Sequence, residues 1–117
     1  MAPTAEAREE LRELLDEVIP EGGSESDTRF TDAQLDRLLG KSRNIYAAAA
    51  EGWTRKAAMF QREMGQIKSY SVGQERYDMA DLTSLLEYAL KMAETYSRMA
   101  ASSMGSMILK FKPPEVL

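Results

Sequence analysis

Cysteine and histidine are both absent from this chain of 117 residues. Without cysteine the chain can form neither a disulfide nor a thiolate metal site. Without histidine it lacks the commonest general base and the commonest transition-metal ligand. An enzyme built on this sequence would depend on carboxylates, lysine or tyrosine alone. We therefore expect a protein that is not an enzyme and that carries no catalytic residues, cofactor or metal.

Long apolar runs are missing as well. No segment approaches the roughly 20 apolar residues that cross a bilayer. The first residues, MAPTAEAREELRELLDEV, lack the basic-then-apolar order of a secretion signal. We expect a soluble protein of the cytoplasm. A chain of this length has material for one domain with a modest core, so anything larger must come from assembly.

Charge is unevenly distributed along the chain. The net charge is -4, yet residues 1–40 hold 11 acidic and 4 basic side chains, whereas residues 41–76 hold 3 acidic and 7 basic ones. One half of the chain could therefore meet the opposite half of another copy. The alternative is two solvated helix faces of unequal charge.

Two long segments carry apolar residues at helical spacing. We expect the first helix to run from about Ser42 to Met64 and the second from Asp78 to Ser102. Gly52 in the first helix suggests close approach by a neighbouring backbone, although a glycine without a structural role is the alternative. The helix-packing face of the first helix comprises Tyr46, Ala49, Ala50, Trp53, Ala57 and Phe60.

The residues before these helices predict two shorter ones. Residues 1–20 form an N-terminal helical arm, in which Thr4 caps a helix over 5–18 and Pro20 stops it. Residues 21–29 are rich in Gly, Ser, Glu and Asp and should be a flexible linker, which would make the arm detachable. A capping box of Thr31 and Gln34 then opens a short helix that ends near Gly40. The expected fold is all-α, a small bundle with two long antiparallel helices, and its helical core spans residues 30–102.

Two segments of the chain lose the helical period. Residues 65–77 should be an extended connection with a turn at Gly73. Residues 103–117 predict an extended C-terminal tail, because Met107, Leu109 and Phe111 alternate with other residues at the spacing of a strand. Such a tail either adds to a partner's sheet edge or groove or folds back over the helices.

Motifs that carry chemistry are absent from the sequence. It contains no phosphate-binding glycine loop, no nucleophile elbow and no cluster of metal ligands. Its paired carboxylates lie in the first turns of predicted helices, where capping explains them. Arg55, Lys56 and Arg62 form a small basic patch, which we interpret as a salt-bridging surface between subunits because the chain is acidic overall.

Four segments in order resemble the small helical connector proteins of tailed bacteriophages, the adaptor or head-completion family beneath the portal. The segments are FTDAQLDRLL, IYAAAAEGWTRKAA, YSVGQERYD and LLEYALKMAETYSRMA, and the likeness spans roughly residues 28–100. It implies a non-enzymatic virion structural protein at the interface of head and tail, assembled in the host cytoplasm. It also implies a ring, usually of twelve copies, that binds the portal on one side and a neck or tail-completion protein on the other. DNA passes through the ring without sequence-specific binding.

The resemblance also assigns residues of this chain. It implies that Trp53 and the neighbouring alanines pack against another helix of the connector core. It places the loop at residues 70–77, with Tyr70, Val72 and Tyr77, near a subunit contact. By position alone, it assigns docking on the portal or another partner to Met107, Ile108, Leu109, Lys110, Phe111, Lys112, Pro113 and Pro114.

A different class of function fits part of the pattern. The alternative is a small helical interaction module or escort protein that acts as a dimer, such as the secreted helical hairpins that carry Trp-x-Gly. Here the order is Gly52-Trp53, inside a helical pattern rather than between two helices, which disfavours that family. A DNA-binding protein is disfavoured because the sequence predicts no broad basic face.

Overall fold

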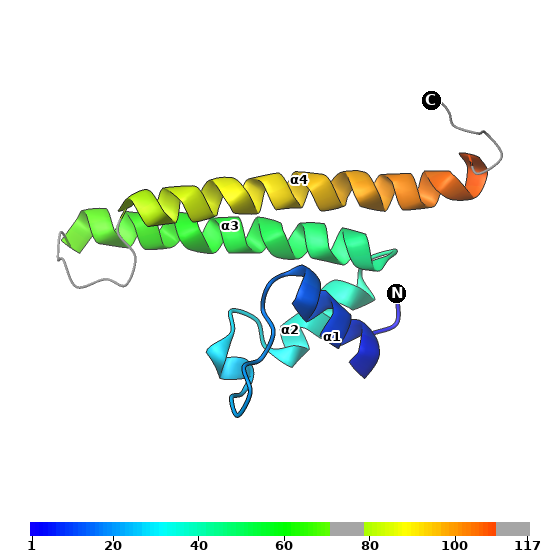
Figure 1. Cartoon of the computed structure of the whole chain (residues 1–117), viewed down its shortest axis with the longest axis horizontal. Helices are drawn as coiled ribbons and strands as arrows, with labels where there is room; N and C mark the ends of the chain where they lie inside the picture. Colours follow the sequence, from blue (N-terminus) through cyan, green and yellow to red (C-terminus); the bar gives the residue numbers. More distant parts are fainter. Residues whose placement is uncertain (71–78, 110–117) are drawn as a thin grey trace.

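The fold is all-α and is organised around one long helical pair. A computed structural model describes residues 1–70 and 79–109 of the chain. Its elements are α1 (Ala5–Leu14), a 3-10 turn η1 (Glu25–Asp27), α2 (Asp32–Gly40), α3 (Ile45–Tyr70) and α4 (Met79–Leu109). Figure 1 shows α3 and α4 antiparallel and side by side, with α1 and α2 beneath α3. The expected fold class is confirmed.

The first helix begins where the sequence predicts and ends earlier. The Thr4 hydroxyl accepts the backbone N–H of Ala7 at 3.0 Å, which caps the helix. At the other end Asp16 adopts a left-handed conformation with φ 58°. The Glu17 N–H donates to the Arg12 carbonyl at 2.8 Å, as in a Schellman motif. The helix predicted over 5–18 thus ends at Leu14, because the chain reverses at Asp16 before it reaches Pro20.

The segment that we expected to be a linker contains defined structure. Ser24 and Asp27 form a capping box at the 3-10 turn η1. The Thr28 hydroxyl donates to the Glu25 carbonyl at 2.8 Å. The capping box of α2 is present as predicted: the Gln34 side chain accepts from the Thr31 N–H at 2.8 Å, and the Thr31 hydroxyl accepts from the Gln34 N–H at 3.1 Å.

The first helix is part of the core and not a detachable arm. Leu11 and Leu15 are completely buried, and they pack with side chains of α2 and α3. Burying a leucine side chain stabilises a fold by about 1.5–3 kcal/mol, so releasing α1 would be costly. The other buried apolar side chains are Ala7, Phe30, Leu35, Leu38, Leu39, Ala48, Ala49, Trp53, Ala57, Phe60, Leu82 and Ala89.

Both long helices extend further than the sequence predicts. Residues 65–70 belong to α3 instead of an extended connection, and Ile67 packs against the core. The α4 helix continues past Ser102 to Leu109. Met107, Ile108 and Leu109 are therefore helical, and the predicted strand is wrong for these three residues. The predicted turn at Gly73 and the tail from Lys110 onward lie outside the described residues.

Candidate functional site

Lys56 belongs to an internal ion pair between the end of α1 and the middle of α3. Its Nζ lies 2.8 Å from Glu17 Oε2, and the two side chains are only 6% and 10% exposed. The ammonium also donates to the Leu15 carbonyl at 2.7 Å and lies 4.2 Å from the centre of the Trp53 ring. Carbonyls at a helix C-terminus favour a cation. Lys56 therefore holds α1 on α3, which corrects the prediction of a subunit contact.

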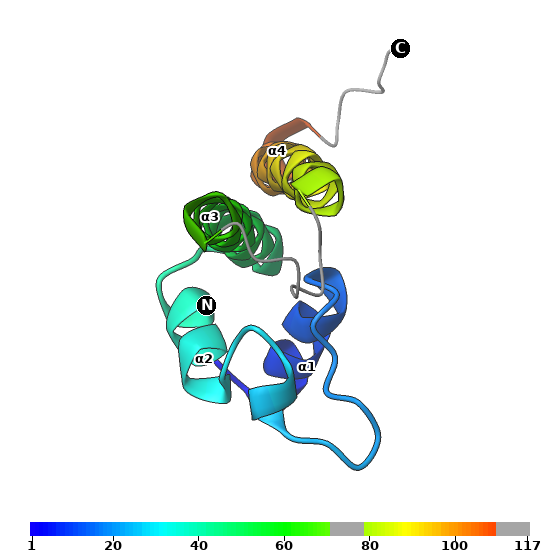
Figure 2. The same ribbon diagram turned by 90° about the vertical axis from the view of Figure 1, so that its left-hand side faces the viewer.

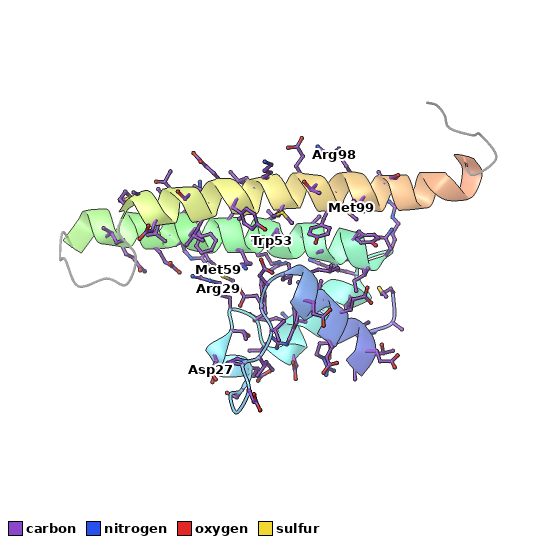
Figure 3. The ribbon with its side chains drawn as sticks, in the orientation of Figure 1. Asp27, Arg29, Trp53, Met59, Arg98 and Met99 are labelled. Atoms are coloured by element: carbon purple, nitrogen blue, oxygen red, sulfur yellow. The ribbon has the colours of Figure 1, made fainter. Side chains whose placement is uncertain are left out.

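Trp53 forms a second contact with the C-terminal end of α1. Its indole N–H donates to the Leu14 carbonyl at 3.0 Å, one of the backbone acceptors that a helix leaves without an internal partner. The ring is 2% exposed, and it meets Tyr88 of α4 edge-on at a centroid distance of 5.4 Å. Figure 3 shows Trp53 in the middle of the molecule. One side chain thus links α1, α3 and α4.

Arg12 organises the segment between α1 and α2. Its buried guanidinium donates to the carbonyl oxygens of Glu17 and Phe30, each at 3.0 Å. It also donates to the Thr28 hydroxyl and to the Asp32 carboxylate, each at 2.9 Å. These four bonds satisfy a charge that would be expensive to bury alone. The segment from residue 17 to residue 32 is thereby held on α1.

Arg29 joins this segment to α3. Its Nη1 lies 2.8 Å from Glu63 Oε2, and its guanidinium carbon lies 4.5 Å from the centre of the Phe60 ring. Figure 3 shows Arg29 beside Met59. The N-terminal layer, which we define as residues 1–40, is therefore attached to α3 by ionic and apolar contacts together.

The remaining helix-packing residues lie on or beside the contact of α3 with its neighbours. Ala49, Ala57 and Phe60 are buried, and Ala50 is half-buried. Tyr46 stacks on Tyr96 of α4, with ring centroids 6.2 Å apart.

Gly52 shows what approaches this face of α3. A Cβ atom at Gly52 would lie 2.7 Å from Leu15 Cδ2. The close neighbour is therefore a side chain of the segment that follows α1, whereas the sequence predicted a backbone.

The pKa of Tyr96 reflects the packing of α4 against the neighbouring elements. Burial raises the pKa of its hydroxyl above the ordinary value of 10.0, and the negative charge of Asp16 and the neighbouring Tyr88 and Tyr46 raise that pKa further. The end of α1 and the aromatic residues of the long pair therefore share one region. A tyrosine in this setting stays protonated and packs as a neutral ring.

A basic groove runs between α2 and α3. Its volume is about 350 Å³. Four cationic side chains surround it, and its apolar lining is Phe30, Leu38, Ala58 and Met59. The cations, all exposed, are Arg37, Lys41, Arg55 and Arg62.

Sequence reasoning found only half of the groove's cations. It selected Arg55 and Arg62 as subunit contacts, and the structure places both on the groove. It missed Arg37 and Lys41, which lie four residues apart and therefore on one face of α2. That spacing, opposite the buried leucines of α2, is the signal that could have identified them.

Helix α4 carries exposed apolar side chains. Leu90 is 52% exposed, Tyr88 47% and Met99 38%. They are interspersed with solvated pairs such as Glu94–Arg98, whose charged atoms lie 3.0 Å apart. Figure 3 shows Arg98 on the side of α4 that faces away from α3. Single exposed apolar residues are common, but these three share a helix whose principal neighbour in the described structure is α3.

The other predicted contact residues give no interface geometry. Tyr70 is the last residue of α3, and Val72 and Tyr77 lie outside the described residues. Of the predicted docking tail, Met107, Ile108 and Leu109 end α4. Lys110, Phe111, Lys112, Pro113 and Pro114 are outside the described range.

Neither a metal centre nor a membrane span was found in the described residues. Across 1–70 and 79–109, no group of three or more acidic side chains is arranged to hold a metal ion. None of the helices described in these ranges combines the length and apolar character needed to traverse a bilayer. A comparison with protein-family models, curated proteins and solved structures finds no match to this chain.

Proposed function

We propose that this chain is a non-enzymatic structural subunit of a tailed-phage virion. Copies of it form a ring that joins the capsid portal to the tail or neck, and DNA passes through the centre. The proposal draws on the resemblance of four consecutive segments, FTDAQLDRLL, IYAAAAEGWTRKAA, YSVGQERYD and LLEYALKMAETYSRMA. It assigns the protein to the neck of the virion and gives it a binding role without turnover.

The observation that carries this proposal is the incomplete covering of α4. This helix of 31 residues has α3 on one side, while α1 and α2 lie against α3 (Figures 1 and 2). Leu90, Tyr88 and Met99 remain exposed along it. A long helix with apolar side chains on its uncovered sides is suited to packing against further subunits.

The charges of the chain are compatible with a DNA passage. The net charge is -4, and an acidic lumen would let a duplex slide because it would not bind the phosphates. The four groove cations are too few and too local for a track along a duplex. They suit a protein contact better.

A binding experiment with the portal protein encoded in the same genome tests the proposal. The purified chain is mixed with assembled portal, and the product is examined by electron microscopy. We expect an added ring with the symmetry of the portal. A chain that adds no density to the portal, at concentrations well above those used for portal assembly, contradicts the connector role.

A pair of variants tests the part played by α4. Leu90→Asp places a charge at an exposed apolar position of α4 and should reduce binding to the portal or to neighbouring copies. Ser84→Asp is the matched control, because Ser84 is an exposed polar residue of the same helix. Circular dichroism should show equal helicity for both variants. Equal assembly by Leu90→Asp and the control would remove α4 from the interface.

The same mixture separates the connector from the alternative function. A small escort protein would form a closed dimer in which both copies use the same patch. Sedimentation would then give twice the monomer mass of 13.1 kDa, independent of portal. A connector adds many copies to one portal.

A further inference from the structure

We propose that the basic groove between α2 and α3 binds the acidic outer face of α1 from a second copy of this chain. This inference extends the proposed function. Only the closure of such contacts into a ring rests on that proposal. The contact itself depends only on surfaces described above.

The groove is shaped and charged for an acidic helix. Arg55 and Arg62 lie seven residues apart on α3, and Arg37 on α2 lies four residues before Lys41, the C-cap of that helix. The two rows of cations flank an apolar lining that includes Leu38 and other side chains. An amphipathic partner would place small apolar or aliphatic surface on this lining and carboxylates on both rims.

The cations of the groove are largely available for a partner. Arg55 is paired with Glu51 at 3.2 Å, and both side chains are more than 40% exposed. The nearest acid of α2, Asp36, is engaged by Arg8 at 3.0 Å. Gln34 at the rim is neutral and belongs to the α2 capping box. The groove therefore keeps a positive charge after its own ion pairs are counted.

The outer face of α1 matches this arrangement. Its glutamates repeat at helical spacing on the side away from Leu11, and each of them is exposed. Glu6 and Glu13 are seven residues apart, the same separation as Arg55 and Arg62. A separation of seven residues corresponds to about 10 Å along a helix. The complete stripe is Glu6, Glu9, Glu10 and Glu13.

The two surfaces lie on different sides of the molecule. In Figure 2, α1 and α2 lie side by side beneath α3, with α2 on the left and α1 on the right. On α1, Arg8 reaches Asp36 of α2, whereas the glutamates point away from that contact according to the helical period. One copy cannot place its own stripe in its own groove without taking α1 out of the core.

Different surfaces on the two partners make the contact heterologous. Contacts of this kind generate closed rings or open chains, because each copy still offers one free groove and one free stripe. A two-fold dimer would use one patch twice. A second copy of the chain is therefore the occupant favoured by charge, spacing and placement, and it leads to the kind of assembly that a connector needs.

Reciprocal charge reversal tests the contact. The groove variant is Arg37→Glu/Arg62→Glu, and the stripe variant is Glu9→Lys/Glu13→Lys. We expect the wild type to associate in a concentration-dependent way in low salt, as measured by sedimentation velocity. Each variant alone should associate about tenfold more weakly or worse, because two attractions become repulsions. Mixing the two variants should restore association, because the native groove of the stripe variant then meets the native stripe of the groove variant.

Restoration in the mixture separates the contact from a folding defect, because two damaged proteins do not repair each other. The matched control is Glu21→Lys, which reverses an exposed charge outside the groove, the glutamate stripe and α4. The control should associate like the wild type. High salt should weaken association of the wild type and of the mixture alike, because it screens exposed charges.

Zero-length crosslinking provides a direct map. Lys41 is the lysine of the groove, and a carbodiimide joins lysine to a carboxylate that it touches. In a mixture of isotopically light and heavy copies, we expect intermolecular peptides that join Lys41 to Glu9, Glu10 or Glu13. Peptides that join Lys41 to residues outside α1, with none to α1, overturn the proposal.

The outcomes distinguish this inference from the proposed function. A monomeric wild type at the highest soluble concentration, or a mixture that does not regain association, overturns the groove contact. A ring that forms on the portal and is unaffected by the groove variant overturns the contact and leaves the connector role intact. Groove-dependent association without portal binding supports the contact and removes the connector role.

Discussion

The N-terminal layer and the long helical pair are held together by different kinds of interaction. The layer is fixed by specific polar contacts, with the buried Arg12 and the Glu17–Lys56 pair at their centre. The α3–α4 pair is held mainly by apolar and aromatic packing, such as Tyr46 on Tyr96. Polar networks of this kind fix a single arrangement of the N-terminal layer on α3. The packing of α4 on α3 leaves the other sides of α4 open. The comparison suggests a rigid base that presents a helix for assembly.

The largest expected effect comes from removing the side chain that links the two regions. Trp53→Ala should lower the free energy of unfolding by about 3–5 kcal/mol, because it leaves a cavity and an unpaired Leu14 carbonyl. Urea denaturation followed by circular dichroism measures this, since the variant has no tryptophan. Leu90→Ala, at an exposed position, should stay within about 0.5 kcal/mol of the wild type. Similar stabilities for Trp53→Ala and Leu90→Ala would contradict the conclusion that Trp53 links the two regions.

The next effect concerns the ion pair of the N-terminal layer. Lys56→Met alone should destabilise the protein by about 3 kcal/mol, because Glu17 is left charged and buried. Glu17→Gln in the same chain should recover part of that loss, since no orphaned charge remains. A double-mutant cycle from denaturation curves measures the coupling. Strictly additive losses would show that the two side chains do not depend on each other.

Two glycines of α3 provide a matched pair with effects of opposite sign. Gly52→Ala should destabilise by about 1 kcal/mol, because overpacking against the buried Leu15 exceeds the gain in helix propensity. Gly65→Ala meets nothing within 4 Å and should stabilise by up to about 1 kcal/mol. Thermal and urea unfolding of both variants measure these changes in stability. They would show how far along α3 the contact with the N-terminal layer extends. Equal shifts of the same sign would contradict this placement.

The smallest effect tests the long pair through its half-buried Tyr96. The pKa of Tyr96 is raised above 10.0 in the folded state, so its neutral form stabilises the fold fully below pH 10. That contribution is lost as the pH rises from the unfolded pKa through the folded pKa, because the unfolded chain releases the proton first. The difference in stability between wild type and Tyr96→Phe should therefore change in favour of the variant above about pH 10. A difference that stays constant across this range would place Tyr96 in a solvent-like setting.

Local signals in the sequence predicted where α1 and α2 begin, whereas α3 begins three residues later than expected, at Ile45. Thr31 and Gln34 form the expected capping box, and Thr4 caps α1 as expected. These features depend on residues three or four positions apart, so the sequence contains all the information. The all-α fold followed from the same helical spacing.

Features that depend on distant residues were missed. The end of α1 is set by the conformation of Asp16 and by the anchoring of Arg12 to residues as far away as Asp32. The extension of α3 to Tyr70 occurs where Ile67 finds apolar neighbours, and packing overrides weak local preference. Lys56 was interpreted as a surface cation because its partner Glu17 is remote in the sequence.

The position of Trp53 has a practical consequence. It is the only tryptophan of the chain, and its ring contacts Lys56 and Tyr88 while its N–H binds the end of α1. Indole emission responds to solvent and to nearby charge. The unmodified protein thus contains an optical reporter of whether α1 is seated on α3, and its fluorescence can follow that contact in real time during assembly.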